Sequence, residues 1–437
     1  MTRILIALVF AFVASFPARA AVDIEEVTSP GGITAWLVQE HTIPFAAIEI
    51  RFRGGTALDL PGKRGAINMM TALIEDGSGD MDAQAFARAR EELAARISFG
   101  AREDSINVSA QFLTENRDAS IALLRQALVS PRFDDDAIER VREQILSGIQ
   151  SDALDPNEIA SRTFDRLTFE DHPYGSSPDG TVESVAALTR DDMVEAHRMS
   201  LARDRIYVAA VGDITPEELA TLLDDLLGDL PETGAPQVAD ADYLLEPGIT
   251  VVPFDTPQSV AVFGHEGIDR DDPDFFSAFV ANEIFGARGL QSRLMEEIRV
   301  KRGLTYGVGA YLALKDRAAL IFGQVATANE RMAETIEVLR NEWTQIAEEG
   351  VTEDELTSAK TYITGAYPLR FDGNAQIAGI MASMQMAGLP IDYIATRNDK
   401  IEAVTLADIR RVAARIYRPE DLHVVVVGQP VGLEPSN

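Results

Sequence analysis

The sequence predicts an α+β protein made of two similar domains that arose by internal duplication. The main observation is a repeat, because the stretch from Leu188 aligns without gaps with the stretch from Val404. The chain length agrees, since 437 residues exceed the roughly 250–300 at which a single core stops growing. Gapless agreement over this length indicates a duplicated unit. The matched pairs share one offset of 216 residues (428 − 212 = 216): Thr189 with Thr405, Asp192 with Asp408, Val208 with Val424, and Gly212 with Gly428.

Strand and helix patterns are interleaved along the chain. Residues 48–53 alternate apolar with charged side chains, and residues 106–112 alternate apolar with polar ones, which predicts two strands with one buried face each. Thr215 and Thr352 each precede a helical pattern and have a glutamate three residues later, the arrangement of a capping box. We therefore expect each domain to be an antiparallel-rich sheet covered on one face by helices.

A segment rich in proline and in small or acidic residues, from Pro231 to Pro247, separates the two repeats. The halves also open alike, with GGIT at Gly31 and PGIT at Pro247. We place an N-terminal domain at residues 21–232, a linker at 233–246 and a C-terminal domain at 247–437.

The first 20 residues read as a secretory signal peptide. Arg3 supplies the positive start, residues 4–16 form an apolar run too short to span a bilayer, and Ala18-Arg19-Ala20 offers a cleavage site. A short membrane anchor is the alternative. No later stretch is apolar for long enough to cross a membrane. We therefore expect an exported protein, in the periplasm, with no membrane span in the mature chain.

Composition excludes several classes of function. The formal charge is −31, and removal of Arg3 and Arg19 with the signal gives −33 (−31 − 2), so nucleic acid and anionic lipid are not expected partners. The chain has no cysteine, which excludes disulfides and thiolate metal sites.

The segment from Gly286 to Tyr311 carries the candidate site. Leu294 and Ile298 lie four residues apart on one face of a predicted helix, and Gly303 follows Lys301 and Arg302 as a C-terminal stop. From Thr305 the pattern alternates, which predicts a strand with Tyr306, Val308 and Ala310 on one side. The turn at Gly303 can bring Arg299 close to Tyr306. The alternative is that Arg299 pairs with Glu296 and Tyr306 fills half-buried sheet surface.

SRLMEEIRVKRGLTYGV, within this segment, resembles the second-half signature of the pitrilysin/insulinase family of zinc peptidases, which includes the mitochondrial processing peptidase. The resemblance covers nearly the whole mature chain. It implies two domains of similar shape that face each other across a closed chamber. It also implies that Arg299 and Tyr306 face the zinc-bound water and the substrate. Gly286 and Gly289 would form a flexible substrate-binding loop near the chamber entrance, with a helix-entry turn as the alternative.

The zinc motif of that family, H-x-x-E-H on a helix, is degenerate in this chain. The matching helix carries Asn68, Thr71 and Ala72 in place of histidine, glutamate and histidine. The resemblance places the third ligand at Ser147 or Gly148, shortly before Asp155-Pro156. An amide, a hydroxyl and a methyl group neither hold zinc nor take a proton at neutral pH. This chain is therefore expected to bind no zinc and to be inactive alone.

Other metal sites are not indicated either. Asp134 to Asp136 read as the acidic start of a helix, since the calcium-loop pattern is missing. The five histidines are scattered singly without metal-ligand spacing: His41, His172, His197, His265 and His423.

The leading hypothesis is a non-zinc subunit of a heterodimeric metallopeptidase. A homologous zinc-bearing partner would supply the metal, and this chain would supply Arg299 and Tyr306 to a peptide bound in extended form along a sheet edge. One alternative is a non-catalytic structural or peptide-binding homologue. Another is a hydrolase that works alone with an unrecognised site. Substrate and partner identity are not encoded in any pattern of the sequence.

Overall fold

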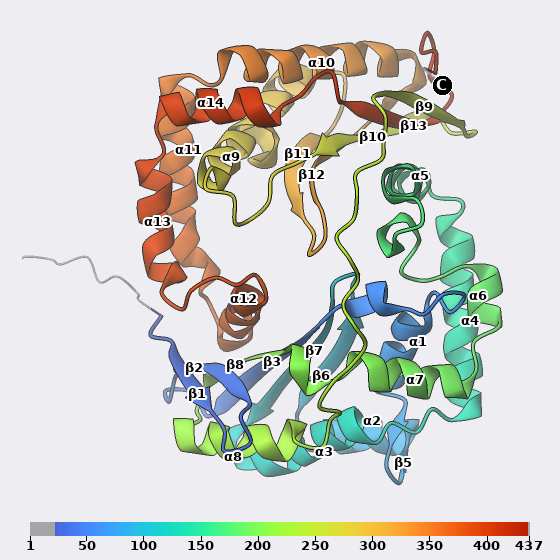
Figure 1. Ribbon diagram of the computed structural model, residues 1–437, viewed down its shortest axis with the longest axis vertical. Helices are drawn as coiled ribbons and strands as arrows, with labels where there is room; N and C mark the ends of the chain where they lie inside the picture. The colour runs from blue at the N-terminus through green and yellow to red at the C-terminus, as the bar shows by residue number, and fades with distance from the viewer. Residues whose placement is uncertain (1–21, 436–437) are drawn as a thin grey trace, which may run out of the picture.

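The computed structural model describes residues 22–435, and the predicted signal peptide lies outside them. A six-stranded sheet forms the first half, in the order β1-β2-β8-β3-β7-β6 (Figure 1). Only the β2–β8 pair is parallel among these strands. A two-residue hairpin, β4 (Gly77–Ser78) with β5 (Met81–Asp82), lies apart from this sheet. The strands are β1 (Glu25–Thr28), β2 (Thr34–Gln39), β3 (Phe45–Arg53), β6 (Arg96–Ala101), β7 (Ser105–Leu113) and β8 (Ile206–Gly212).

The second half repeats this topology. Its sheet has the order β11-β12-β10-β13-β9, which in reverse matches β2-β8-β3-β7-β6 strand for strand, and β13–β9 is its one parallel pair. A shared order with the parallel pair in the same place confirms the predicted duplication. The strands are β9 (Gly248–Pro253), β10 (Gln258–Glu266), β11 (Val308–Leu314), β12 (Ala319–Ala328) and β13 (His423–Gly428).

The duplicated residues occupy equivalent places. Thr189 and Thr405 are N-caps with complete capping boxes. Gly212 and Gly428 end their strands at φ 136° and 149°. A Cβ on Gly212 would lie 2.3 Å from the carbonyl oxygen of Phe45, so the strand end passes too close to its neighbour for a side chain.

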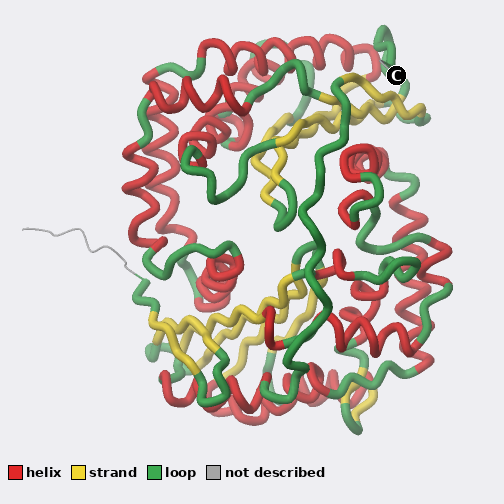
Figure 2. Tube along the Cα trace, in the orientation of Figure 1, coloured by secondary structure: helices red, strands yellow, loops and turns green. Residues whose placement is uncertain are grey.

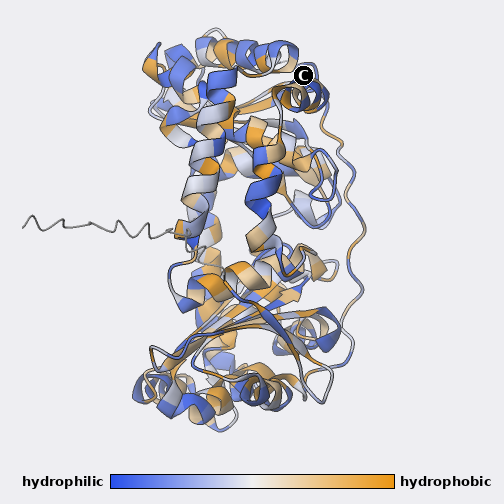
Figure 3. Cartoon of the chain, turned by 90° about the vertical axis from the view of Figure 1, so that its left-hand side faces the viewer, coloured by the Kyte–Doolittle hydropathy of each residue, from blue (hydrophilic) through white to orange (hydrophobic). Residues whose placement is uncertain are grey.

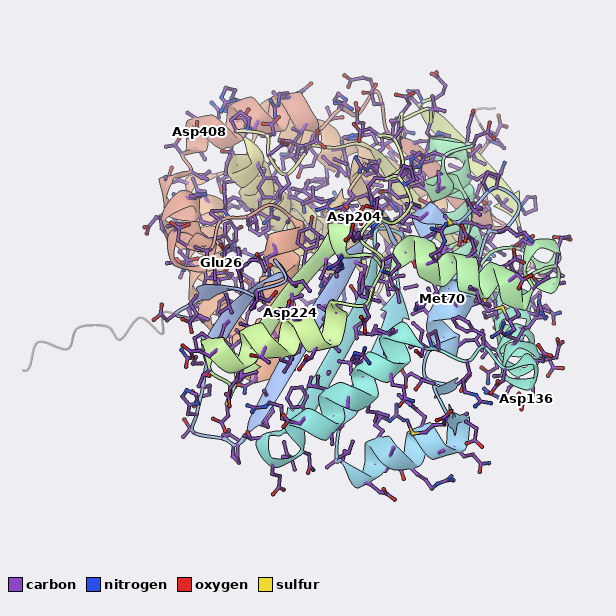
Figure 4. All side chains as sticks on the ribbon, turned by 60° about the horizontal axis from the view of Figure 1, so that its bottom comes forward. Glu26, Met70, Asp136, Asp204, Asp224 and Asp408 are labelled. Atoms are coloured by element: carbon purple, nitrogen blue, oxygen red, sulfur yellow. The ribbon has the colours of Figure 1, made fainter. Side chains whose placement is uncertain are left out.

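Helices cover the outer face of each sheet (Figures 1 and 3). In the first half, α8 lies across the sheet, and its Asp224 accepts hydrogen bonds from Ser29 Oγ and from the backbone N–H of Gly31 (Figure 4). The first-half helices are α1 (Ala66–Leu73), α2 (Ala83–Glu92), α3 (Arg117–Val129), α4 (Asp135–Asp152), α5 (Pro156–Phe169), α6 (Val182–Ala186), α7 (Arg190–Ser200) and α8 (Pro216–Leu227). The second-half helices are α9 (Phe275–Asn282), α10 (Met332–Glu349), α11 (Glu353–Ala366), α12 (Asn374–Met386), α13 (Tyr393–Ala403) and α14 (Leu406–Ile416).

The halves exchange one helix each across their facing sides (Figure 2). Helix α12 of the second half packs on the first sheet, where Met381 and Ala382 contact Ala47 and Val211. Helix α5 of the first half packs on the second sheet, where Phe164 meets strands β10 and β13 in one buried cluster. Apolar residues therefore lie on both faces of the central strands.

This exchange explains a departure from the expected strand pattern. Residues 48–53 were predicted to bury one face, but in β3 both faces are covered over much of its length, and Glu49 is only 8 % exposed. Burial raises the pKa of Glu49, while a hydrogen bond with Ser109 and the charge of Arg51 lower it. A single sequence contains no sign that a helix more than 300 residues away covers this face.

A second contact joins the halves at the tip of the β11–β12 hairpin. Lys315 forms an ion pair with Glu103, and Arg53 forms one with Asp316 at 2.5 Å. Arg53 also donates to the carbonyl oxygen of Met386 at the end of α12. The same arginine thus binds both second-half elements that approach the first sheet.

Most predicted caps and elements are confirmed. Thr215 and Thr352 are N-caps of α8 and α11 with complete capping boxes, and Asp134 is the N-cap of α4. No helix or strand is assigned between Leu227 and Gly248, the stretch that contains the predicted linker. Within residues 22–435, none of the helices combines the length and apolarity that a bilayer crossing requires.

Asp165 on α5 makes the contact between the halves sensitive to pH. Burial raises its pKa from 3.8 to about 7, and the charge of Lys315 opposes this. Because the folded-state pKa lies above the unfolded value, the carboxyl group favours folding fully below pH 3.8 and loses that contribution as the pH rises through about 7. Asp165→Asn should abolish this loss. Between pH 4 and 8, wild type should lose up to about 4 kcal/mol more unfolding free energy than the variant, measured by urea denaturation.

Asp171→Asn, at an exposed aspartate just beyond α5, is the matched control and should follow the wild-type pH profile. Identical pH profiles for wild type and Asp165→Asn would contradict the assignment.

Candidate functional site

The helix that matches the zinc motif is α1, and none of its three motif side chains is a metal ligand. Asn68 donates through Nδ2 to Asp179 Oδ1 at 2.9 Å. Thr71 is buried and donates its hydroxyl to the carbonyl oxygen of Ile67 in the preceding turn, while the methyl group of Ala72 faces solvent. These side chains are satisfied locally, and none offers a lone pair of the kind that zinc takes from histidine or a carboxylate.

A guanidinium group lies beside the degenerate motif. Arg162 of α5 forms an ion pair with Asp152 at 2.7 Å and approaches the second carboxylate oxygen of Asp179 at 3.8 Å. Ser147 and Gly148 on α4 are exposed, and a Cβ on Gly148 would meet nothing within 4 Å. The positions of the family's ligand set therefore carry neutral groups, with a fixed positive charge nearby.

Two buried histidines have structural roles. His265 is fully buried between the backbone carbonyl of Glu266 and the indole N–H of Trp343, and burial lowers its pKa to about 4. His423 bonds to Thr250 and to the carbonyl of Glu246. In the described part of the chain, no three histidine, cysteine, aspartate or glutamate side chains gather to hold a metal ion.

The second candidate region begins with a helical turn, η7 (Met295–Val300), in which π-type hydrogen bonds replace the predicted α-helical ones. Leu294 and Ile298 are both fully buried, as their spacing predicts. Gly303 has φ 61° and ends the turn, and its N–H donates to the carbonyl of Arg299. Short π segments of this kind recur near functional sites.

The strand after this turn starts later than predicted. β11 begins at Val308, so Tyr306 is not on the buried side with Val308 and Ala310; its side chain is 88 % exposed. The alternative that Tyr306 fills half-buried sheet surface is also wrong. The alternating pattern predicted a strand that begins too early, at Thr305. The chain between Gly303 and Gly307 lies outside the sheet, because it forms the turn.

The turn that carries Tyr306 is held by side chains on neighbouring elements. Thr305 donates to the carbonyl of Ala326 at 2.7 Å, Thr327 donates to that of Leu304, and Arg331 donates to that of Gly303. Sequence reasoning missed all three, since a lone threonine or arginine on a later strand or turn has no distinguishing pattern. The phenol is thus exposed on a backbone that is fixed at three points.

Arg299 is partly exposed, and none of the hydrogen bonds and ion pairs among residues 22–435 involves its guanidinium group. The suggested pair with Glu296 is not formed. Glu297 instead binds the neighbouring cations Lys301 and Arg302. No hydrogen bond or cation–π contact in this part of the chain joins Arg299 to Tyr306, so the structure leaves both groups available on one segment.

A cavity of about 500 Å³ lies beside this turn and has glycines along its wall. Gly286 is buried against β11, where a Cβ would lie 2.6 Å from the backbone nitrogen of Ala310. Gly289 is exposed at φ 56° in a short turn, and Gly307 faces open space. Gly286 and Gly289 therefore line the same cavity as the residue after Tyr306.

Comparison with solved structures identifies the fold. The fold matches a structure described as the peptidase M16 inactive domain from Pseudomonas fluorescens, with a TM-score of 0.87 and 24 % identity over 94 % of this chain and 99 % of the other. It also matches a protease from Helicobacter pylori, with a TM-score of 0.84 and 16 % identity over 93 % and 99 %. The chain thus has the two-domain fold of M16 peptidases.

Sequence comparison identifies the family. Residues 35–181 match the profile of insulinase (peptidase family M16), and residues 187–363 match that of the peptidase M16 inactive domain. A non-peptidase homolog, YmxG of Helicobacter pylori, is 25 % identical over 89 % of this chain and 90 % of its own length. An uncharacterized zinc protease of Mycobacterium tuberculosis, Rv2782c, is 24 % identical over 91 % of each. The chain belongs to peptidase family M16, as an inactive homologue whose motif positions carry no zinc ligands.

Zinc should contribute nothing to the stability of the isolated protein. A metal that binds the folded state raises the melting temperature, and a chelator reverses this. After dialysis against excess zinc and then desalting, the protein should retain far less than one equivalent of zinc, measured by inductively coupled plasma mass spectrometry. Addition of EDTA should leave Tm unchanged. Stoichiometric zinc, or a lower Tm in EDTA, would show a site that the motif positions do not explain.

Proposed function

We propose that this chain is the non-zinc subunit of a heterodimeric metallopeptidase. A homologous chain with an intact zinc motif would hold the metal, and this chain would present Arg299 and Tyr306 to the bound peptide. We also propose, from the character of residues 1–20, that the protein is exported to the periplasm.

One observation carries the proposal: the exposed phenol stands on a fixed backbone. Tyr306 is 88 % exposed, yet the carbonyls of Gly303 and Leu304 and the hydroxyl of Thr305 are all bonded to neighbouring elements. A surface tyrosine with no function gains nothing from such support. A side chain that must contact a substrate does benefit from such support. Its backbone is already fixed, so little conformational entropy is lost when the substrate binds.

The glycine-lined cavity supports an extended peptide as the substrate. β11 is the edge strand of its sheet, and Gly307 and Gly309 at its start carry no side chains that would keep another backbone away. Edge strands bind extended peptides through main-chain hydrogen bonds. The cavity, about 500 Å³, is large enough for a few residues of such a peptide next to Tyr306.

The residues of this chain would assist hydrolysis at the partner's metal. The zinc ion, when bound by the partner, supplies Lewis-acid chemistry at the scissile carbonyl. Arg299 would hold a carbonyl or carboxylate of the peptide with its unpaired guanidinium group. Tyr306 would donate its hydroxyl proton in a hydrogen bond to the oxyanion that develops as the carbonyl becomes tetrahedral.

A second candidate is a peptide-binding or structural homologue without catalysis. It is favoured by the motif positions Asn68, Thr71 and Ala72, which carry no zinc ligand in this chain. In that case the same cavity binds a peptide, but no zinc-bearing chain co-purifies and Tyr306 is dispensable.

Tyr306→Phe tests the catalytic role. In a complex with a zinc-bearing homologue, the change should lower kcat about a hundredfold, equivalent to ~3 kcal/mol, because one oxyanion donor is lost. Assembly, measured by analytical ultracentrifugation, should be unaffected, since the side chain is exposed and its support comes from the backbone.

Tyr362→Phe is the matched control, because Tyr362 is also an exposed tyrosine, on α11, and should leave kcat unchanged. Wild-type kcat in Tyr306→Phe would refute the role of the phenol, and failure of any zinc-bearing homologue to form a complex would favour the non-catalytic candidate.

Gly307→Val tests the peptide site independently of catalysis. A Cβ at this position meets nothing within 4 Å and the backbone is not in the left-handed region, so Tm should change little. The side chain would fill the cavity and weaken peptide binding about tenfold or more, measured by fluorescence polarisation of a labelled extended peptide. Unchanged affinity would place the peptide elsewhere. Gly365→Val, at a position on α11 that is also open, controls for the added side chain.

A further inference from the structure

A second cavity, of about 290 Å³, lies entirely within the second half. Helices α9, α12 and α13 and the short turn after α11 form its walls; these helices are labelled in Figure 1. Its lining is divided in character. One part is apolar and is formed by Phe275, Phe276, Phe279 and Met384. The other part carries the guanidinium groups of Arg270, Arg370 and Arg397.

The guanidinium groups are oriented by the rings. Arg397 stacks over Tyr367 at 4.2 Å, and Arg270 stacks over Phe275 at 4.7 Å from the ring centroid. Arg270 also donates to the hydroxyl of Tyr393 at 3.1 Å. Stacking holds a planar guanidinium by its face and leaves its N–H edge free to donate.

All three arginines line the cavity near the phenol of Tyr367. Burial raises the pKa of the Tyr367 phenol, and the charges of Arg397, Arg370 and Arg270 each lower it. Arg397 is only 7 % exposed, and its own pKa is lowered first by burial and also by the nearby charge of Arg370. Three positively charged guanidinium groups thus lie close together around a partly buried cavity.

No aspartate or glutamate of the described chain forms an ion pair with these arginines. None of the three arginines forms an ion pair within residues 22–435; Arg397 donates to the neutral side-chain amide of Asn398 and hydrogen-bonds with the hydroxyl of Tyr393. Two acids close to Arg270 in the chain are engaged elsewhere, since Asp272 pairs with Arg415 and Asp274 with Arg411. Glu283 feels the charge of Arg397, but burial raises its pKa and it forms no ion pair with that arginine. A buried charge is normally paired, so the buried guanidinium of Arg397 lacks a counter-ion among the described residues.

The duplication adds a positional argument. Helices α9, α11, α12 and α13 correspond in chain order to α1, α4, α5 and α6, the elements around Asn68. The cavity therefore occupies, in the second half, the place that the degenerate motif occupies in the first. In the first half the ligands for a metal cation are missing. In the second half three arginine side chains line a cavity.

We propose that this cavity binds an organic carboxylate whose body is apolar or aromatic. The guanidinium edges of Arg270, Arg370 and Arg397 would receive the carboxylate, and the phenylalanine rings with Met384 would contact the apolar body. This site is separate from the segment of Arg299 and Tyr306 and does not depend on the proposed peptidase role. The carboxylate can belong to a free small acid or to the C-terminal residue of a peptide.

Calorimetric titration of the full mature chain tests the proposal. The probes are N-acetylphenylalanine and a hexapeptide that ends in phenylalanine, each as the free acid and as the amide. The free acid should bind at least about tenfold more tightly than its amide, because charge-assisted hydrogen bonds are lost in the amide. Binding of the hexapeptide acid assigns the site to peptide C-termini, and binding of the small acid alone assigns it to small molecules.

Two substitutions connect binding to the cavity. Arg397→Gln and Arg370→Gln should each weaken binding of the acid about tenfold. Arg370 is exposed, so its variant keeps the test valid even if Arg397→Gln fails to fold. Arg166→Gln, at an exposed arginine on α5, is the control and should bind as wild type. Equal binding of acid and amide, no binding at about 10 mM probe, or wild-type affinity in Arg370→Gln and in a folded Arg397→Gln would overturn the proposal.

Discussion

The reciprocal packing of α5 and α12 is the constraint on which the rest of the structure depends. Each central strand is apolar on both faces, and a sheet with two apolar faces must be covered twice. The outer faces are covered by helices of the same half, and the inner faces by one helix from the other half. Burial of Met381 and Ala382 against the first sheet, and of Phe164 against the second, therefore holds the two halves together as it completes each core.

The relative position of the halves determines what the candidate sites can do. Arg53 binds the end of α12 and the β11–β12 hairpin, so the hairpin tip is held against the first half. The N-terminal end of β11, with Gly307 and the turn of Tyr306, then lies beside a cavity to which α5 contributes Asn157. The proposed peptide site is thus built from both halves, although the side chains proposed to act come from the second alone.

The two copies of the duplicated unit differ in character at one equivalent place. In the first half, the helix after the third strand carries Asn68, Thr71 and Ala72, each satisfied locally or exposed. In the second half, the corresponding helix borders the cavity with Arg270, Arg370 and Arg397. A chain with a net charge of −31 thus keeps three arginines together on one cavity, without an ion pair to any of them among the described residues.

The sequence by itself determined the family, the duplication, the strand patterns and the helix caps, because these depend on residues close in the chain or repeated at a constant offset. It also determined the loss of the zinc ligands, because the family resemblance places Asn68, Thr71 and Ala72 at the motif positions and none of these side chains binds zinc. Only the tertiary structure decided that the inner faces are covered by exchanged helices and that Tyr306 leaves the sheet. It alone showed that Thr305, Thr327 and Arg331 fix the turn of Tyr306 and that three arginines share a cavity. These features arise from contacts between residues distant in the chain, and local periodicity contains no information about such contacts.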